Sequence, residues 1–176
     1  MLKIGIIIGS TREGRLSDQV GNYVLEKGKD SGLALEIVDL KTYDLPLLGT
    51  ANPVNLNAYK EKIASLDGFI FVTAEHNHSI PASLKNGLDY LRDEWNNKPA
   101  GIVSFGSLGG SRATEHLRGI LGELQIADVR SHTAFSLFTD FENYSVFKPS
   151  DLHLANLNTM FSQVKAWGEA FKSLRK

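Results

Sequence analysis

The sequence predicts an α/β fold in which a parallel sheet of five strands carries helices on both faces. Five short apolar segments alternate along the chain with longer segments whose apolar residues recur at helical spacing. The apolar segments are almost continuously hydrophobic, which is typical of strands that are covered on both faces. Because connections between parallel strands are right-handed and pack back on the sheet, helices are expected on both of its sides. Five strands favour the order 2-1-3-4-5, with a crevice between strands one and three.

The five strands are predicted from composition and alternation. Residues 2–8 are rich in isoleucine, which indicates burial on both faces, and residues 35–40 alternate apolar and polar side chains. Residues 68–73 are rich in aromatic and β-branched side chains, and residues 98–105 form a strand that is entered through a proline. Residues 127–135 are more polar, as an edge strand should be.

The helices are predicted from apolar residues that repeat every three or four positions. Pro81 suits the first turn of the third helix, where its missing N–H would have no partner anyway. The last helix places a stripe of apolar side chains on one face, and this stripe includes Trp167 and Leu174. Segment 44–48 is expected to be extended, and segment 136–150 is expected to be irregular. The expected helices are 16–27, 56–66, from Ser79 or Ile80 to 91, from Arg112 to 124, and 150–174.

Composition bounds the class of protein. A chain of 176 residues with 42% hydrophobic and 22% charged residues is expected to form one domain, residues 1–176. A formal net charge of −1 favours neither nucleic acid nor a membrane as a partner. The chain has no cysteine, which excludes disulfides and cysteine nucleophiles and fits a reducing compartment. The apolar start is too short to cross a bilayer, so we expect a soluble, cytoplasmic protein.

The loop after the first strand has the composition of a phosphate site. Two arginines offer charge, three hydroxyls offer hydrogen bonds, and the N–H groups of the following helix point to the same place. Two arginines suit a phosphate monoester, and a solvated turn with surface arginines is the alternative. The loop lacks the Lys-Ser/Thr ending of a P-loop, the G-x-G-x-x-G pattern and the cysteine of a phosphatase. The residues concerned are Ser10, Thr11, Arg12, Arg15 and Ser17.

Two further loops follow strands three and four. Ala74, Glu75, His76 and Asn77 lie at the carboxyl end of a strand, where ligands bind in open α/β sheets, although an ordinary polar loop would look the same. His76 and His78 lie two residues apart on a turn, but no third ligand accompanies them, so no metal site is predicted. His116, His132 and His153 show no constellation and are expected to be surface or packing residues.

The third loop is rich in glycine. Gly106, Gly109 and Gly110 let a flat ligand approach the backbone closely. Arg112 follows just inside the next helix, where it holds either an anionic ring edge or only the loop itself. The glycines alone are weak evidence, and their value comes from the two other loops at the same edge of the sheet.

Three motifs in these loops resemble the motifs of a known protein family. The first, Gly-Ser-x-Arg with a later Arg or Ser, is matched by Gly9, Ser10, Arg12, Arg15 and Ser17. The second, Pro-Glu-Tyr-Asn before a proline-entered helix with Lys-Asn, is matched from Ala74 to Asn77, by Pro81, and by Lys85 and Asn86. The third, Gly-Gly-x-Arg, is matched by Gly109, Gly110 and Arg112. Over residues 1–135 the chain resembles the NADPH-dependent FMN reductase family, which has a flavodoxin-like fold.

The resemblance implies a flavodoxin-like three-layer α/β/α sandwich that binds FMN. It places the phosphate in the first loop, the isoalloxazine edge against residues 74–77 and the pyrimidine side against residues 106–110. Two residues depart from the family pattern: Ala74 replaces proline and His76 replaces tyrosine, so the flavin potential or the acceptor could differ. The implied cofactor-binding residues are Ser10, Thr11, Arg12, Arg15, Ser17, Ala74, Glu75, His76, Asn77, Gly106, Gly109, Gly110 and Arg112.

The resemblance also implies an assembly. Family members are usually homodimers or homotetramers, with the helix near residues 80–91 at the subunit contact. Tyr90, Leu91 and Trp95 fit that contact, although they fit a core equally well.

The implied function is that of an FMN-dependent NAD(P)H oxidoreductase. NADPH or NADH would pass a hydride to flavin N5, and the electrons would go on to a quinone, azo compound, metal ion or free flavin. The chemistry belongs to the cofactor, so no catalytic side chain is predicted. One alternative is a flavodoxin-type FMN electron carrier, which a net charge of −1 disfavours because such carriers are strongly acidic. Another is a non-catalytic binding module on the same fold.

Overall fold

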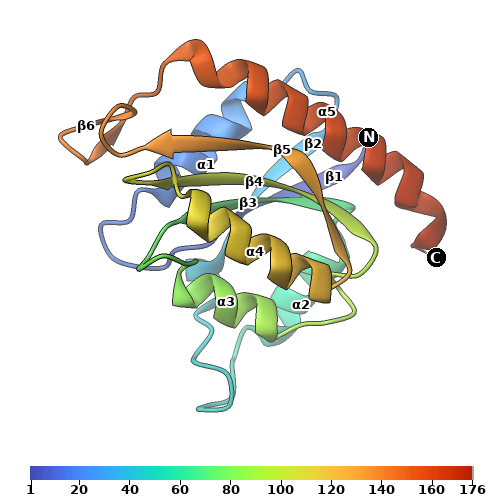
Figure 1. Cartoon of the computed structure of the whole chain (residues 1–176). Helices are drawn as coiled ribbons and strands as arrows, with labels where there is room; N and C mark the ends of the chain where they lie inside the picture. The colour runs from blue at the N-terminus through green and yellow to red at the C-terminus, as the bar shows by residue number, and fades with distance from the viewer. Residues whose placement is uncertain (176) are drawn as a thin grey trace.

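The sheet has the predicted strand order. A computed structural model describes residues 1–175 and contains a five-stranded sheet in the order β2-β1-β3-β4-β5. Neighbouring strands pair in parallel throughout, so all five carboxyl ends meet at one edge (Figure 1). The prediction of fold class is therefore confirmed. The strands are β1 (Lys3–Ile8), β2 (Ala34–Asp39), β3 (Gly68–Ala74), β4 (Lys98–Gly106) and β5 (Ile126–Ser136).

The helices form a layer on each side of the sheet (Figure 1). One layer consists of α1 and α5, and the other consists of α2, α3 and α4, so the molecule has the three layers of the flavodoxin-like fold. None of the helices in residues 1–175 has the length and apolar character that a membrane span requires. The helices are α1 (Ser17–Lys27), α2 (Leu56–Ala64), α3 (Ala82–Asp89), α4 (Ser111–Glu123) and α5 (Leu154–Ala170), with 3₁₀ turns η1 (Leu40–Tyr43), η2 (Asp151–His153) and η3 (Phe171–Leu174).

Each face of the sheet has its own hydrophobic core. On the α1 and α5 side, Ile4, Val24 and Met160 are wholly buried. On the other side, Trp95 is wholly buried beside Phe69, and its Nε1 donates to the Leu88 carbonyl at 3.2 Å. Of the two roles expected for Trp95, a subunit contact or a core position, the structure therefore shows the core position.

The largest differences from the predicted elements lie before α3, after β5 and in the last helix. The third helix begins at Ala82, and neither Ser79 nor Ile80 belongs to it, because residues 76–79 form a tight turn closed by two backbone hydrogen bonds. The irregular segment after β5 contains a short hairpin, β6 (Phe141–Glu142) and β7 (Val146–Phe147). The last helix is shorter than expected, and Trp167 and Leu174 on its predicted buried stripe are 41% and 58% exposed.

The loops at the carboxyl edge are tied to one another through the backbone. The N–H of Gly9 donates to the Val72 carbonyl at 3.0 Å, and the N–H of Glu75 donates to the Phe105 carbonyl at 2.9 Å. Leu137, beyond β5, donates in the same way to Gly106 at 2.9 Å. Each strand exit is therefore fixed to its neighbour, which brings the predicted loops together.

Candidate functional site

A cavity of about 190 Å³ opens at the carboxyl edge of the sheet. Ligand pockets usually measure ~300–1,000 Å³, so a ligand of FMN size would extend beyond this one. Predicted site residues form much of its wall, and Leu16, Phe105 and Leu137 complete it. Sequence reasoning missed these three because apolar residues at a strand end or in an irregular segment carry no motif. The predicted residues that line the cavity are Ser10, Arg12, Arg15, Ala74, Glu75, His76 and Gly106.

The two arginines of the first loop have different surroundings. Arg15 donates to Asp39 Oδ1 and to the Ser10 carbonyl, both at 2.8 Å, and its second terminal nitrogen pairs with Asp39 Oδ2. The hydrogen bond to Asp39 raises the pKa of Arg15. The exposed side chain of Arg12 makes no hydrogen bond or ion pair with residues 1–175. Arg15 thus fastens the loop to the end of β2, and Arg12 remains available to an anion.

Ser17 is the first residue of α1 and is wholly buried. Its Oγ has no hydrogen-bond partner within residues 1–175, although an unsatisfied buried hydroxyl costs about 1–3 kcal/mol. Leu16 gives the amino end of α1 no side-chain cap, and the N–H of Gln19 donates to Asp18 Oδ1 at 3.0 Å. The other N–H groups of the first turn and the positive end of the helix dipole face the same loop. The hydroxyl, the helix end and Arg12 together form an environment suited to a phosphate.

The second loop makes a sharp turn directly after β3. His76 and Ser79 exchange backbone hydrogen bonds of 2.9 and 3.1 Å, while Asn77 and His78 take positive φ angles of 47° and 73°. Asn77 is consequently exposed beyond the cavity. Burial, with a smaller effect of Arg12, lowers the pKa of His76, which favours its neutral imidazole.

An ion pair joins the second and third loops. The Glu75 side chain is only 6% exposed, and it pairs with the guanidinium of Arg112. Glu75 Oε2 also accepts from the backbone N–H of Arg112 at 3.3 Å, near the start of α4. Of the two roles expected for Arg112, the structure therefore shows the loop-holding one. Its Nε is nevertheless buried without a partner among residues 1–175, so one donor remains for a ligand.

The glycines of the third loop are required by close packing. Gly110 has a φ of 75°, and a Cβ there would lie 2.9 Å from the Phe105 nitrogen. A Cβ at Gly106 would lie 3.0 Å from the Cβ of Glu75. Larger residues would therefore push the loops apart. The predicted site residues that do not line the cavity are Thr11, Ser17, Asn77, Gly109, Gly110 and Arg112.

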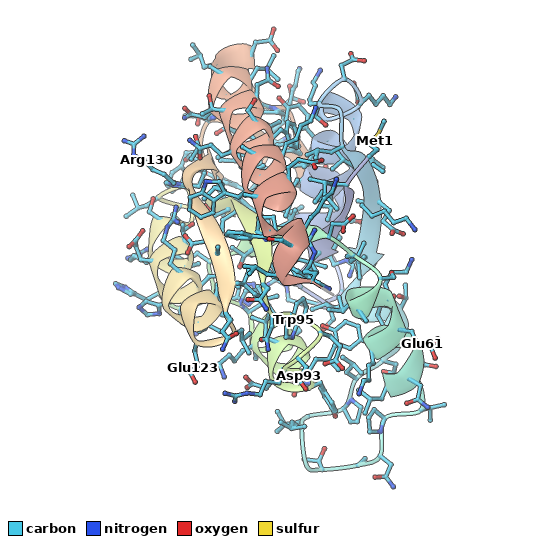
Figure 2. The ribbon with its side chains drawn as sticks, turned by 90° about the vertical axis from the view of Figure 1, so that its right-hand side faces the viewer. Met1, Glu61, Asp93, Trp95, Glu123 and Arg130 are labelled. Atoms are coloured by element: carbon cyan, nitrogen blue, oxygen red, sulfur yellow. The ribbon has the colours of Figure 1, made fainter. Side chains whose placement is uncertain are left out.

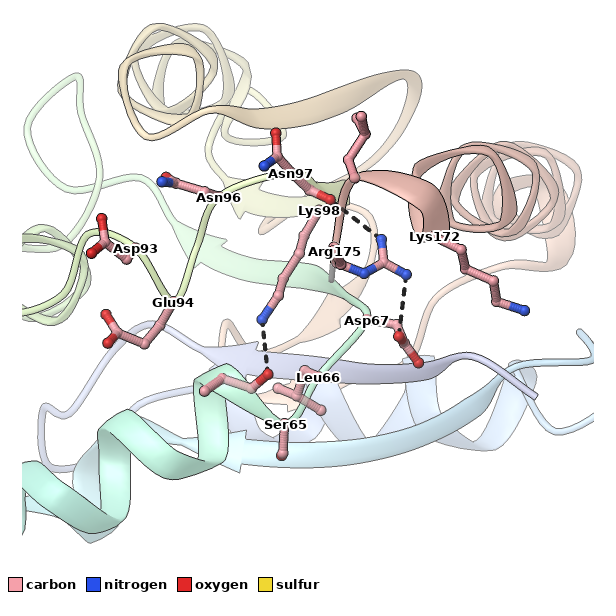
Figure 3. Close-up of a pocket in the computed structure, with 12 residues that line it drawn as sticks. Ser65, Leu66, Asp67, Asp93, Glu94, Asn96, Asn97, Lys98, Lys172 and Arg175 are labelled. Atoms are coloured by element: carbon pink, nitrogen blue, oxygen red, sulfur yellow. Dashed lines mark hydrogen bonds and ion pairs between the residues drawn. The ribbon is translucent and has the colours of Figure 1, made fainter.

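A larger cavity of about 640 Å³ lies at the opposite, amino edge of the sheet (Figure 3). Lys98 there donates to the carbonyls of Ile63 and Ala64 at 2.8 and 3.2 Å, and Figure 3 shows Arg175 turned toward Asp67. The charged groups of Lys98 and Arg175 in this larger cavity thus already have protein partners. In open α/β sheets the ligand edge is the carboxyl edge, so the smaller cavity is the candidate site.

Comparisons with known proteins show the family to which the chain belongs. The model of the family described as NADPH-dependent FMN reductase matches residues 2–140, which include all three loops. The chain belongs to the NADPH-dependent FMN reductase family. The resemblance drawn from the motifs is confirmed, and so is the prediction of an oxidoreductase that uses FMN and NAD(P)H.

Similar proteins cover most of the chain. An NAD(P)H-dependent FMN reductase of Schizosaccharomyces pombe is 35% identical over 92% of this chain and 88% of its own length. A 2-hydroxy-1,4-benzoquinone reductase of a Burkholderia species is 34% identical over 71% of this chain and 73% of its own length. The flavoenzyme FerB of Paracoccus denitrificans shares the fold, with a TM-score of 0.77 at 19% identity over 97% of this chain and 99% of FerB.

The residues present fit FMN. The unpartnered Ser17 hydroxyl and the guanidinium of Arg12 suit its phosphate. Leu16, Phe105 and Leu137 offer apolar surface to a ring system, and Arg112 Nε offers a donor to a ring oxygen or nitrogen.

Proposed function

We propose that this chain is an FMN-dependent NAD(P)H oxidoreductase whose acceptor is a quinone. The observation that carries the cofactor site is the buried, unpartnered hydroxyl of Ser17 at the amino end of α1, the helix that follows the loop with Arg12. Support for a quinone acceptor comes from relatives named quinone reductase, among them one of Pseudomonas putida that is 32% identical over 78% of this chain. An azo compound, a metal ion and free flavin remain alternative acceptors.

We assign the phosphate of FMN to the first loop. Arg12 would supply charge, Ser10, Thr11 and Ser17 would supply hydrogen bonds, and the first N–H groups of α1 would complete the shell. Arg15 would act indirectly, because its bonds to Asp39 and to the Ser10 carbonyl hold the loop in shape.

We assign the ring system of FMN to the second and third loops. Residues 74–77 would lie along its edge, and residues 106–110 would lie against its pyrimidine side, with Arg112 Nε as a donor. Leu16 and Phe105 would exclude water from the buried part of the ring. Bound FMN would accept a hydride from the nicotinamide at N5 and pass electrons to the acceptor. Hydride transfer requires no protein base, so the side chains bind and orient.

We propose that the protein acts as a homodimer or homotetramer in the cytoplasm. Segment 44–55 extends away from the helices as an arm in both views (Figures 1 and 2). Asn86 and Tyr90 of the α3 region hold its base through the Pro46 carbonyl, each at 2.8 Å. Leu47 and Val54 on the arm are 67% and 94% exposed, which supports a contact with another copy. Light scattering of the wild type and of Leu47→Glu tests this proposal. The variant should form an assembly of lower molar mass than the wild type only if the arm joins subunits.

The proposed activity is tested by visible spectra of FMN-supplemented, desalted protein under anaerobic conditions. NADPH is added first, NADH second and a quinone last. Rapid bleaching by either nucleotide, followed by recovery on quinone addition, would support the proposal and identify the donor. Flavin bands that persist with both nucleotides would support the electron carrier instead. A protein that retains no flavin would support the non-catalytic binding module.

A further inference from the structure

Two exposed histidines meet beside the candidate flavin site. His78 lies on the tight turn after β3, and His116 lies in the second turn of α4. Their ring centroids are 5.9 Å apart, and the ring planes are tilted by 50°. The pairing joins residues that are far apart in the sequence, so spacing alone gave no sign of it.

The separation of the rings matches a shared metal ion. Two imidazoles bound to one ion at metal–nitrogen distances of ~2.0–2.1 Å bring their ring centroids to roughly 4.5–6.5 Å from one another, depending on the angle between the two metal–nitrogen bonds. The 50° tilt shows that the two rings are not stacked face to face. Because exposed side chains change rotamer within picoseconds to nanoseconds, both rings can present a nitrogen to a common ion.

A neighbouring hydroxyl can orient the ring of His116 for metal binding. His116 Nδ1 lies 3.0 Å from the Oγ of Ser79. When Nδ1–H donates to this hydroxyl, Nε2 keeps its lone pair and is free to bind an ion. Metal-binding histidines almost always donate their second ring N–H to such a partner.

The backbone holds His78 close to α4. The turn that carries it is closed by the two hydrogen bonds between His76 and Ser79. His78 has a φ of 73°, in the left-handed region where asparagine, aspartate and histidine are enriched among residues other than glycine. In this conformation the imidazole of His78 lies next to that of His116.

The charges around the pair permit a cation. Arg112 lies one turn before His116 on α4, and its charge is paired with Glu75. Glu115, next to His116, is largely exposed and lies 3.5 Å from Arg118. The nearest positive charges thus have carboxylate partners.

We propose that His78 and His116 form a binding site for a divalent transition-metal ion, with Cu²⁺ bound more tightly than Ni²⁺ or Zn²⁺. This order follows from the general affinity of nitrogen ligands for first-row metals. Residues 1–175 contain no cluster of three or more histidine, cysteine, aspartate or glutamate side chains that could hold a metal. The site is therefore open: the protein supplies two nitrogens, and water supplies the remaining ligands. Its location next to residues 74–79 leaves the ion accessible from solvent at the rim of the proposed flavin site.

The test is a titration of FMN-loaded protein, with any affinity tag removed, by CuSO₄ in a non-chelating buffer. Electron paramagnetic resonance counts the nitrogens on the ion, and calorimetry gives the affinity. We expect one ion bound through two imidazole nitrogens, and affinity at least about tenfold lower in His78→Ala and in His116→Ala. His132→Ala is the matched control, because His132 is half-buried on β5 and should leave the titration unchanged.

Two results would overturn the proposal. One is wild-type affinity in both His78→Ala and His116→Ala. The other is an equal loss of affinity in His132→Ala. Ser79→Ala gives a finer readout: it should weaken binding while the number of bound nitrogens stays the same, because it removes only the partner of Nδ1. The flavin spectrum reports separately whether each variant still binds FMN, so failure of the metal site is distinguishable from failure of the flavin site.

Discussion

Replacing Arg15 by alanine should destabilise the flavin-free protein. The Arg15 and Asp39 side chains are only 12% and 21% exposed, and Arg15 makes bonds to both carboxylate oxygens and to the Ser10 carbonyl. Exposed ion pairs contribute about 0.2–1 kcal/mol, whereas breaking a buried pair costs about 3–5 kcal/mol. Because this pair is mostly buried, we expect a loss of about 2–3 kcal/mol in the free energy of unfolding.

The loss is large enough to measure by thermal unfolding. At about 2–4 °C per kcal/mol for a chain of this size, Tm should fall by roughly 4–12 °C. Arg12→Ala is the matched control, because its exposed side chain has no partner in residues 1–175 and should change stability by less than about 0.5 kcal/mol. In the double variant Arg15→Ala with Asp39→Ala, the loss should be smaller than the sum of the two single losses.

One outcome would refute this reasoning. If Arg15→Ala unfolded at the wild-type temperature and weakened FMN binding as much as Arg12→Ala, Arg15 would be a phosphate ligand and its pairing with Asp39 incidental. Fluorescence quenching of FMN, titrated with each variant, supplies the binding constants for that comparison.

Four further predictions test separate parts of the site and the fold. Arg12→Ala should weaken FMN binding by about 1.5–3 kcal/mol through loss of charge-assisted bonds. An unchanged dissociation constant, measured by quenching of FMN fluorescence, would show that the phosphate binds elsewhere. His76→Tyr should leave FMN affinity near normal and shift the flavin's reduction potential. Identical potentials in the two proteins would show that histidine in place of tyrosine has no effect on the flavin. Gly110→Ala should lower stability by about 1–3 kcal/mol, because a Cβ at this φ of 75° meets the Phe105 nitrogen at 2.9 Å, whereas Gly119→Ala, with open space around it, should not. Burial lowers the pKa of Lys98 to about 8, so between pH 8 and about 10.4 the unfolded chain binds more protons there. The free energy of unfolding of the wild type should therefore rise with pH relative to that of Lys98→Met across this window. If urea unfolding showed the same pH dependence in both proteins, the lowered pKa of Lys98 would be contradicted.

Local patterns were sufficient to predict the sheet. The burial of β1 and β3 on both faces follows from their continuous apolar residues, and the order 2-1-3-4-5 follows from the strand count and the handedness of the connections. The start of α3 could not be predicted in the same way. Glycine is the usual sign in a sequence of a turn with two positive φ angles, but here Asn77 and His78 take those positions.

The site was predictable in its residue types and not in its pairings. The composition of the loops identified Arg15 and Glu75, but Asp39 lies on another strand and Arg112 on another helix. Such contacts depend on which strand ends become neighbours in the sheet, and spacing along the chain does not contain that information. The His78–His116 pair escaped detection for the same reason.

These pairings change the electrostatic character of the candidate site. The candidate loops and the start of α4 carry three arginines, but Asp39 neutralises Arg15 and Glu75 neutralises Arg112, which leaves Arg12 as the guanidinium without a carboxylate partner among residues 1–175. A phosphate monoester carries close to two negative charges at pH 7, so one guanidinium does not balance it. The remaining stabilisation must come from uncharged donors: the first N–H groups of α1 and the hydroxyl of Ser17. Such donors act at short range and require a fixed loop, and the Arg15–Asp39 pair fixes it. Arg15, one of the two arginines that sequence reasoning assigned to the phosphate, would thus contribute by holding the backbone on which the proposed phosphate binding depends.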